Sequence, residues 1–502
     1  MSVLDYFAKP GFFLVILALL LLAGSCDKQA SKISVPEDEA VGDIRTPQIE
    51  RDLAEIREQG VLNAIAIYNS TSYFLYRGEP MGFEYELLKR LADELEVELN
   101  MIIAEDIDEL FNMLNRGEGD IIAFGLTITE DRKEVVDFTE HHYVTHQVLV
   151  QRKPENWRRL PLHKIQRQLV SDPLDLIGDT VHVRMNSSYH DRLINLTQEI
   201  GGNIHIEPVP GNVTTDEIIQ MVVDDSIDYT VADYNIAAIN QTYYPILDIE
   251  TPISFSQRIA WAVRKNSPDL LNEINTWIRA AKKRDYYYVI YNKYFKNKKS
   301  YKRRIRSDFY SKNSGKISPY DDLIKKHAEK LGWDWRLLAS QIYQESRFDP
   351  GAESWAGAGG LMQIMPATAS DLGLNRIMDP SANIRAGTNY LQKLSKNWES
   401  IPDTTQRLKF ILASYNCGLG HVRDAQRLTE ASGEDPQVWD NHVEDFVLKL
   451  SSREYFSRPE VRYGFLRGRE PYLYVKEIFL RYEHYKKFIP RTLPDSTAVT
   501  SS

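Results

Sequence analysis

The stretch QIYQESRFDP, at residues 341–350, contains a glutamate that is positioned to act as an acid. The preceding residues have a helical pattern, in which Ile342 lies three residues and Leu338 seven residues before Glu345, so the carboxyl group shares the apolar face. Burial disfavours the charged form of a carboxyl group, and a protonated carboxyl can donate to a leaving oxygen. We therefore predict a general acid at Glu345. Taken alone, a glutamate near a helix end is more often a surface charge.

Three further sequence blocks follow this glutamate. They are ESWAGAGGLMQIMPATASDLGL at 353–374, LASYNCGLGHV at 412–422 and EPYLYVKEIF at 470–479. The glycines of the first block allow sharp turns and close approach of the backbone to another surface. Together with ESRFDP, and in this order, the blocks resemble the lytic transglycosylase family of the lysozyme superfamily over residues 319–487.

This resemblance implies a role for each matched residue. Glu345 falls on the catalytic acid of the family, and Tyr474 is expected near it. The residues implied to hold the sugar and its acetamide group are Ser354, Met362, Gln363, Tyr415, Asn416 and Tyr474. Outside this resemblance, the two tyrosines would be interpreted as ordinary core aromatics. SYN in place of AYN, and CGLG where the family often has alanine and proline, change no residue with a chemical role.

Most glycosidases use two carboxylates, whereas the blocks around Glu345 supply one. The resemblance implies that Glu345 protonates the glycosidic oxygen between N-acetylmuramic acid and N-acetylglucosamine, and that the muramyl acetamido group supports the positive charge. The ionised glutamate then takes the proton of the C6 hydroxyl, which closes a 1,6-anhydro ring. We expect no metal or organic cofactor, because no His, Cys or Asp cluster has ligand spacing. The alternatives are a hydrolytic muramidase and a domain that only binds glycan.

Residues 48–295 have a different pattern, in which apolar β-type runs such as VLNAIAI alternate with helical stretches such as FEYELLKRLADELE. This alternation predicts an α/β domain. The segments GVLNAIAIYNSTSYFLYRGEPMGFEYELL and DIIAFGLTITEDRKEVVDFTEHHY resemble the periplasmic amino-acid-binding proteins of solute transport, which hold an amino acid between two lobes.

The second resemblance implies a ligand site in this first domain. Arg132 falls on the arginine that binds the ligand carboxylate, a pairing suited to bidentate hydrogen bonds, and Asp233 falls on the acid that binds the amino group. The other implied ligand residues are Thr127, Ser187 and Ser188, with Tyr73 as a wall of the pocket. The alternative for Arg132 is a surface arginine at a helix start. Gly125 stands where some relatives have serine, which leaves the preferred ligand side chain open.

Composition and length limit the remaining possibilities. The chain has 502 residues, of which 43% are hydrophobic and 26% charged, as in soluble globular proteins, and its net charge of −10 argues against a nucleic-acid partner. We predict a multidomain protein: the α/β two-lobed periplasmic-binding-protein domain at 48–295, a basic linker at 296–318, a mainly α lysozyme-like domain at 319–490 and a disordered tail at 491–502.

The N-terminus resembles an export signal, with Lys9, an apolar run at 11–22 and then AGSC. The run is shorter than the roughly 20 residues of a membrane-spanning helix. We predict a lipoprotein-type signal peptide at 1–26, lipidation of Cys26 and a tether at 27–47; the alternatives are an uncleaved anchor and a plain signal peptide. The expected location is the periplasmic face of the outer membrane, with the inner membrane as the alternative because of Asp27.

The two resemblances together imply a murein-cleaving enzyme whose activity is regulated by ligand binding to its first domain. Its expected partners are peptidoglycan glycan strands, an amino acid or wall-derived peptide, and a membrane that holds the lipid anchor. The alternative from another functional class is a solute receptor whose C-terminal domain only binds glycan.

Overall fold

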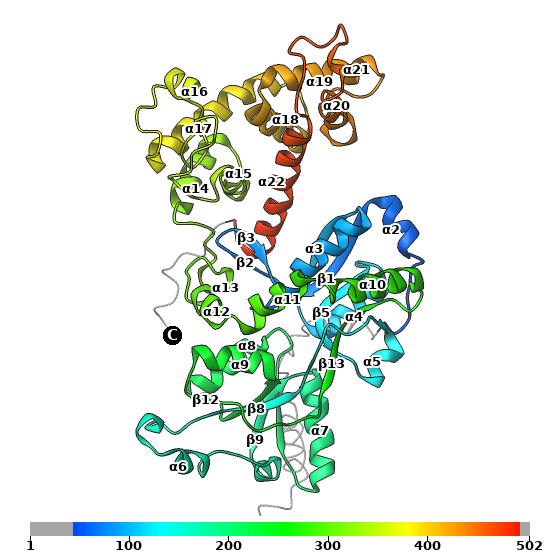
Figure 1. The fold of residues 1–502 in the computed structure, drawn as a ribbon, viewed down its shortest axis with the longest axis vertical. Coiled ribbons are helices and arrows are strands. Elements are labelled where there is room, and N and C mark those ends of the chain that lie inside the picture. Colours follow the sequence, from blue (N-terminus) through cyan, green and yellow to red (C-terminus); the bar gives the residue numbers. More distant parts are fainter. Residues whose placement is uncertain (1–43, 492–502) are drawn as a thin grey trace, which may run out of the picture. The chain divides into compact units, whose positions relative to one another are not determined.

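The structure is a computed structural model that describes residues 44–491 (Figure 1). The predicted signal peptide, Cys26, most of the tether and the tail after residue 491 lie outside the described residues. Within 44–491, no helix combines the length and the apolar character needed to cross a membrane.

The first lobe is built on a six-stranded sheet in the order β4-β1-β5-β13-β6, with β7 also paired to β13. Strand β1 is parallel to β4 and β5, whereas β13 runs antiparallel to β5. The strands are β1 (Val61–Ile67), β4 (Glu98–Ala104), β5 (Ile121–Thr127), β6 (Asp137–Phe138), β7 (Tyr143–Thr145) and β13 (Gln257–Val263).

Helices cover both faces of this sheet, which explains why its strands are apolar on both sides. Along β1, Ala64 and Ala66 belong to the core beneath α3, whereas Ile65 and Ile67 belong to the core beneath α4. The surrounding elements are α2 (Leu53–Gln59), the hairpin β2 (Phe74–Tyr76) and β3 (Glu79–Met81), α3 (Phe83–Leu95), α4 (Ile107–Arg116), α5 (Glu130–Val135), α10 (Pro268–Ala281) and α11 (Asp285–Tyr291).

The second lobe contains a five-stranded sheet in the order β10-β9-β11-β8-β12. The chain crosses into it at His146, between β7 and β8, and returns through residues 249–256. Its elements are β8 (Gln147–Arg152), α6 (Leu162–Gln166), β9 (Thr180–Arg184), α7 (Ser188–Ile200), β10 (His205–Val209), α8 (Thr215–Val223), β11 (Tyr229–Asp233), α9 (Tyr234–Tyr243) and β12 (Leu247–Asp248). This two-lobed α/β arrangement agrees with the fold class predicted from the sequence.

The segment at 296–318, which we expected to be a polar connector, contains α12 (Lys298–Ile305) and α13 (Ser311–Ser314). Tyr301 and Arg304 of α12 are buried, and the helix packs against α9. The Arg304 guanidinium lies 5.3 Å from the ring centre of Tyr294 and 5.6 Å from that of Phe74. Tyr301 and Ile305 give this otherwise basic helix an apolar side, so the segment packs against the first domain.

Residues 319–491 form a helical domain, and the prediction of a mainly α second domain is confirmed. Figure 1 shows α18 among the other helices, and it packs against α17, α19 and α22. The helices are α14 (Asp321–Leu331), α15 (Trp335–Ser346), α16 (Pro366–Asp371), α17 (Pro380–Ser395), α18 (Thr404–Cys417), α19 (Leu419–Ala431), α20 (Glu444–Lys449), α21 (Arg453–Phe456) and α22 (Arg469–Phe488).

Local capping signals fix several of these helix ends. Asp334 accepts a hydrogen bond from the Arg336 amide at the start of α15, and Asp379 caps α17 in the same way ahead of Pro380. Gly332 ends α14 with φ of 69°. Helix α14 begins at Asp321, whose carboxylate accepts hydrogen bonds from the amide and the hydroxyl of Ser318.

Candidate active site and ligand pocket

The glutamate singled out from the sequence is the next-to-last residue of α15. Ile342 and Leu338, on the same face of the helix, are fully buried in the domain core. Glu345 itself remains partly exposed. The carboxyl therefore lies at the edge of the core, where a substrate can reach it while protein atoms still replace most of its water.

Helix α22 supplies the hydrogen-bond partner of this carboxyl. The Tyr474 hydroxyl donates to Glu345 Oε1 at 2.5 Å, and Gln341 Nε2 donates to the Tyr474 oxygen at 3.2 Å. Burial raises the pKa of Glu345 to about 8, against the opposing effect of the hydrogen bond from Tyr474. At neutral pH the carboxyl group is therefore mainly protonated, but the pH is close enough to its pKa for both protonation states to be accessible. A group that donates a proton and later accepts one requires this.

The glycine-rich block after α15 is a tightly bonded loop. Gly360 has φ of 78°, and a Cβ at this position would lie 2.3 Å from Asn383 Nδ2. Asn383, on α17, accepts from the Met362 amide and donates to the carbonyl of Gly359. The Gln363 amide group donates to the carbonyls of Ala352 and Gly360, both at 2.9 Å. These bonds hold the loop in one conformation.

The remaining predicted glycan residues have different environments. The Tyr415 hydroxyl donates to the Met362 carbonyl at 2.8 Å, which joins α18 to the loop. Burial raises the pKa of Tyr415, and the charge of Glu345 raises it further, which indicates that the two side chains lie near each other. Ser354 Oγ accepts from the Ala358 amide at 3.0 Å, and Asn416 is partly exposed beside Tyr415. The Met362 side chain is fully buried, so its contribution is to the packing of the loop.

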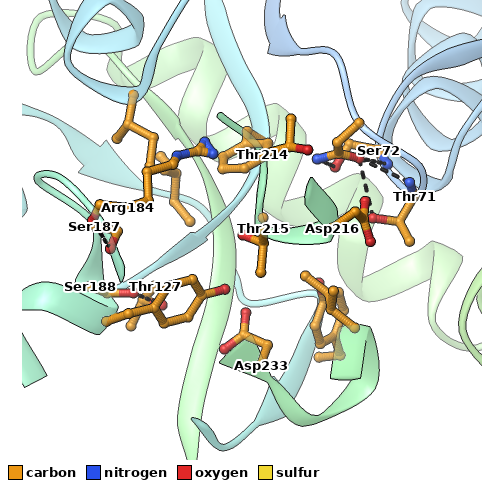
Figure 2. A pocket seen from close by; sticks show the side chains of 18 of the residues that line it. Thr71, Ser72, Thr127, Arg184, Ser187, Ser188, Thr214, Thr215, Asp216 and Asp233 are labelled. Atoms are coloured by element: carbon orange, nitrogen blue, oxygen red, sulfur yellow. Dashed lines mark hydrogen bonds between the residues drawn. The ribbon is translucent and has the colours of Figure 1, made fainter. Parts of the chain in front are cut away.

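A second candidate site lies between the two lobes of the first domain (Figure 2). Five residues predicted from the sequence line it: Thr127, Arg132, Ser187, Ser188 and Asp233. Thr127 ends β5 in the first lobe and Ser188 begins α7 in the second, and their hydroxyl oxygens lie 3.2 Å apart. Figure 2 shows this pair on one side of the pocket and the Asp233 carboxylate directed into it.

Charged groups from both lobes face this pocket. Arg132 Nη1 donates to the Thr127 carbonyl at 3.1 Å, and its guanidinium lies 5.7 Å from the Phe111 ring centre. Asp233 is buried, and its Oδ1 has no hydrogen-bond partner among the described residues. Burial raises the pKa of Asp233 to about 7, while a hydrogen bond from Tyr189 acts in the opposite direction. A ligand ammonium group would satisfy Asp233 and favour its charged form.

Comparisons with known proteins identify both halves of the chain. Residues 322–438 match the family of transglycosylase SLT domains, and residues 64–297 match the bacterial extracellular solute-binding proteins of family 3. Membrane-bound lytic murein transglycosylase F of Desulfosudis oleivorans is 38% identical over 437 residues, which cover 87% of this chain and 92% of that protein. The chain belongs to the membrane-bound lytic murein transglycosylase F family.

Another member of the transglycosylase F family, from Pseudomonas fluorescens, is 31% identical to this chain, and the matched region covers 86% of each protein. Among solved structures, a mutant of ArgBP from T. maritima is 29% identical with a TM-score of 0.40, covering 48% of this chain and 98% of that one. Membership of the transglycosylase F family confirms both resemblances drawn from the sequence. The chain is a peptidoglycan lytic transglycosylase with a solute-binding domain ahead of its catalytic domain.

One residue expected at the ligand pocket of this transglycosylase F member lies elsewhere. Tyr73 is fully buried, and its hydroxyl hydrogen-bonds to Nδ1 of His484 on α22. Its ring also contacts Phe488, at 5.3 Å between centres. Tyr73 is not among the residues that line the pocket, whereas Thr71 and Ser72 before it are.

Several site residues had no signal in the sequence patterns. Gln341 lies four residues before Glu345, a spacing that places both on one helix face, yet its contact with Tyr474 could not be foreseen without α22. In the ligand pocket, Arg184 and Asp216 join the predicted residues. Asp216 accepts from Ser70 Oγ at 2.5 Å and from Asn240 Nδ2 at 2.9 Å. Among residues 44–491, no group of three or more His, Cys, Asp or Glu is arranged to hold a metal ion.

Proposed function

We propose that this transglycosylase cleaves the β-1,4 bond between N-acetylmuramic acid and N-acetylglucosamine with formation of a 1,6-anhydromuramyl end. The observation that carries the proposal is the Glu345 carboxyl, which is partly exposed, hydrogen-bonded to Tyr474 and raised in pKa to about 8 by its surroundings. Such a group can transfer a proton in both directions near neutral pH.

In the first step, Glu345 gives its proton to the glycosidic oxygen as the bond to the muramyl C1 breaks. The oxygen of the muramyl acetamido group supports the positive charge at C1. The Tyr474 hydroxyl, 2.5 Å from Oε1, stabilises the carboxylate that forms. In the second step, this carboxylate accepts the proton of the C6 hydroxyl while O6 bonds to C1, so Glu345 returns to its protonated form and no water is consumed.

The residues around this acid supply the means to hold the sugar. Ser354 and Gln363 belong to the loop that Asn383 fixes, and Asn416 lies on α18 beside Tyr415. We assign hydrogen bonds to sugar hydroxyl and acetamide groups to Ser354, Gln363 and Asn416. Tyr415 and Met362 support the loop on which these contacts depend.

Mass spectrometry of products from purified peptidoglycan tests this proposal. We expect muropeptides that end in 1,6-anhydromuramic acid, and no such products from the Glu345→Gln variant. Reducing-end muramic acid as the main product would indicate a hydrolytic muramidase instead. Retention of intact glycan by a protein that releases no product would indicate a domain that only binds.

For the first domain, we propose that the pocket between the lobes binds the two charged ends of an amino acid or a wall-derived peptide. The supporting observation is the buried Asp233 oxygen without a partner, in a pocket that also contains Arg132 and the hydroxyls of Thr127 and Ser188. Arg132 suits the ligand carboxylate, and Asp233 suits its ammonium group.

We further propose that ligand binding alters the activity of the catalytic domain. Helix α22 supports this proposal, because Tyr474 on this helix bonds to Glu345 while Tyr485, near its other end, donates to the Gly78 carbonyl of the first domain at 2.8 Å. Closure of two lobes around a ligand can change how a neighbouring element is held. The alternative is that the domain only positions the enzyme on the cell wall.

For the cellular location, we propose a lipid anchor at Cys26 on the periplasmic face of the outer membrane, with the inner membrane as the alternative. The proposal rests on the apolar run and the AGSC segment, and on relatives that are named membrane-bound. Metabolic labelling with a fatty-acid analogue, followed by membrane fractionation, should place the label with the outer membrane. Loss of the label in Cys26→Ala would identify the anchored residue, whereas equal labelling of parent and variant would exclude Cys26.

A further inference from the structure

A buried glutamine lies behind the tyrosine that contacts the catalytic acid. Gln341 is fully buried on α15, one helical turn before Glu345. Its Nε2 donates to the Tyr474 oxygen at 3.2 Å, and Tyr474 donates to Glu345 at 2.5 Å, so the three side chains form a chain of hydrogen bonds. The other end of the amide, Oε1, is buried without a hydrogen-bond partner among the described residues.

An unpaired buried acceptor costs free energy, so its presence beside the reacting group calls for a reason. An amide group carries a donor and an acceptor of nearly equal size. Half a turn of the Gln341 amide about its last bond would exchange Nε2 and Oε1 without movement of the backbone. The amide can therefore either donate to Tyr474 or accept from it.

These two orientations match the two charge states that Glu345 must adopt. With the amide donating, the Tyr474 proton is directed to Glu345, which suits the carboxylate. With the amide reversed, Tyr474 donates to Gln341 and its oxygen accepts the proton of the neutral carboxylic acid. Each orientation keeps both hydrogen bonds between Gln341, Tyr474 and Glu345 and leaves the other end of the amide unpaired.

We propose that Gln341 is a positioning residue that lets Tyr474 reverse its hydrogen bond as Glu345 passes from acid to base. The inference rests on the proposed two-step role of Glu345. An apolar residue at position 341 would support neither direction. Hydrogen bonds to charged groups are stronger than those between neutral groups. Loss of the Gln341 amide should therefore destabilise the carboxylate form of Glu345 more than its neutral form, which raises the pKa of Glu345.

The test is a double-mutant cycle in the full chain with Gln341→Met, which keeps the length of the side chain but removes its donor and acceptor, and Tyr474→Phe. We measure kcat/KM on purified peptidoglycan as a function of pH. For Gln341→Met we expect kcat/KM to fall by roughly 2- to 100-fold, the range that corresponds to couplings within one hydrogen-bond network. We also expect the alkaline limb of the pH profile of kcat/KM to shift to higher pH. In the Tyr474→Phe background, the same change should cause little further loss.

Ser340→Ala is the matched control. Ser340 is also buried on α15, and its hydroxyl donates to the Ile478 carbonyl of α22 at 2.7 Å, so this change removes a contact between the same two helices without touching Tyr474. We expect Ser340→Ala to lower thermal stability and leave the alkaline limb in place. If Gln341→Met does not fold, as judged by circular dichroism, Gln341→Leu replaces it in the same cycle.

Additive losses in the cycle, or an unchanged alkaline limb in the Gln341 variant, would assign this residue to packing alone and overturn the inference. Failure of the proposed function is recognised separately. If Glu345→Gln retains activity, the acid has been misassigned. If Glu345→Gln is inactive while the cycle is additive, the role of Gln341 alone is rejected.

Discussion

At the scale of single residues, the proposed chemistry depends on one carboxyl at the boundary between core and solvent. Glu345 is exposed enough to meet a substrate, while its neighbours exclude enough water to favour the neutral form. The hydrogen bond from Tyr474 limits this effect, because it stabilises the carboxylate. The balance leaves the group near its midpoint at a pH where both proton transfers are possible.

This balance predicts how activity depends on pH. In the proposed reaction Glu345 starts protonated, and burial raises its pKa to about 8, so kcat/KM should fall as the pH rises through about 8. The measurement is release of soluble muropeptides at constant ionic strength, with enzyme preincubated at each pH and returned to pH 7 as the control for inactivation. A profile that stays flat to pH 10 would contradict the assignment of Glu345 as the acid.

The Glu345→Gln variant should lose activity and gain stability at alkaline pH. Loss of the transferable proton should reduce turnover by roughly 10²- to 10⁴-fold. In the parent, the raised pKa of Glu345 contributes to the free energy of unfolding. This contribution is complete below about pH 4.5 and is lost as the pH rises through about 8, because Glu345 ionises at a lower pH in the unfolded chain than in the folded protein.

Urea unfolding of parent and Glu345→Gln at pH 5 and pH 9 checks the second half of this prediction. The free energy of unfolding of the variant, relative to that of the parent, should be higher at pH 9 than at pH 5. Asp371→Asn, at the end of α16 in the same domain, is the control for removal of a carboxylate. Equal differences at both pH values would mean that Glu345 is not desolvated.

At the scale of secondary-structure elements, the proposed active site depends on the loop between α15 and α16. Backbone amides and carbonyls of this loop are bonded to Asn383 and Gln363, and Tyr415 ties it to α18. Helices α17 and α18 thus hold one irregular segment. Any contact between this segment and a glycan depends on the conformation of the segment. Gly360 makes that conformation possible, because its backbone is left-handed and its neighbours leave no room for a side chain.

Gly360→Ala should therefore destabilise the protein and reduce activity. The alanine methyl would meet Asn383 Nδ2 and the Ile377 carbonyl within 2.4 Å, in a left-handed backbone conformation with φ of 78°. Gly373→Ala is a matched control, because Gly373 has φ of 64° with no atom within 4 Å of its Cβ position.

Both changes share the cost of a left-handed alanine, about 1–2 kcal/mol. Overpacking should add about 1–3 kcal/mol at position 360 alone. Thermal and urea unfolding measure the difference between the variants, and muropeptide release measures its effect on activity. Equal stability of the two variants would show that the loop can relax around the methyl group.

At the scale of the whole molecule, one chain combines an enzyme with a solute-binding domain. Tyr485 and His484 of α22 contact Gly78 and Tyr73 of the first domain, and Tyr474 of the same helix contacts Glu345, the proposed acid. Energetic coupling between two sites must be reciprocal and typically amounts to about 1–3 kcal/mol.

Isothermal titration of the full chain with amino acids and soluble muropeptides should reveal a ligand for the first domain. Arg132→Ala should abolish or strongly weaken binding because it removes the partner of the ligand carboxylate, and Asp233→Asn should do so because it removes the partner of the ammonium group. Arg116→Ala, which removes partly exposed salt bridges of α4 in the same lobe, controls for loss of an arginine.

The same ligand should change the rate of glycan cleavage by roughly 5- to 150-fold at saturation, the range that corresponds to typical coupling energies. This change should be absent in Arg132→Ala, whose basal rate should match that of the parent. If no zwitterionic ligand binds, or if binding leaves the rate unchanged, the first domain is not a sensor and its role is limited to positioning.

The sequence by itself determined the features that depend on neighbouring residues. The apolar periodicity before Glu345, the caps at Asp334 and Asp379 and the stop at Gly332 are local signals, and each is present in the structure. The order of the motif blocks was enough to predict two domains and their families, because these blocks are short stretches that can be recognised from the sequence alone, and both family matches confirm the prediction.

Only the tertiary structure decided which distant side chains meet. Gln341 and Tyr474 are 133 residues apart, and Tyr73 and His484 are 411 apart, so neither contact leaves a periodic signal in the sequence. The packing of the helix at 298–305 could not be predicted for a similar reason. Its polar composition indicated a connector, whereas in the structure Tyr301 and Arg304 are buried and Arg304 lies against the rings of Tyr294 and Tyr301. Local patterns fix the elements because their hydrogen bonds are short in range, whereas the pairing of side chains depends on how the elements pack.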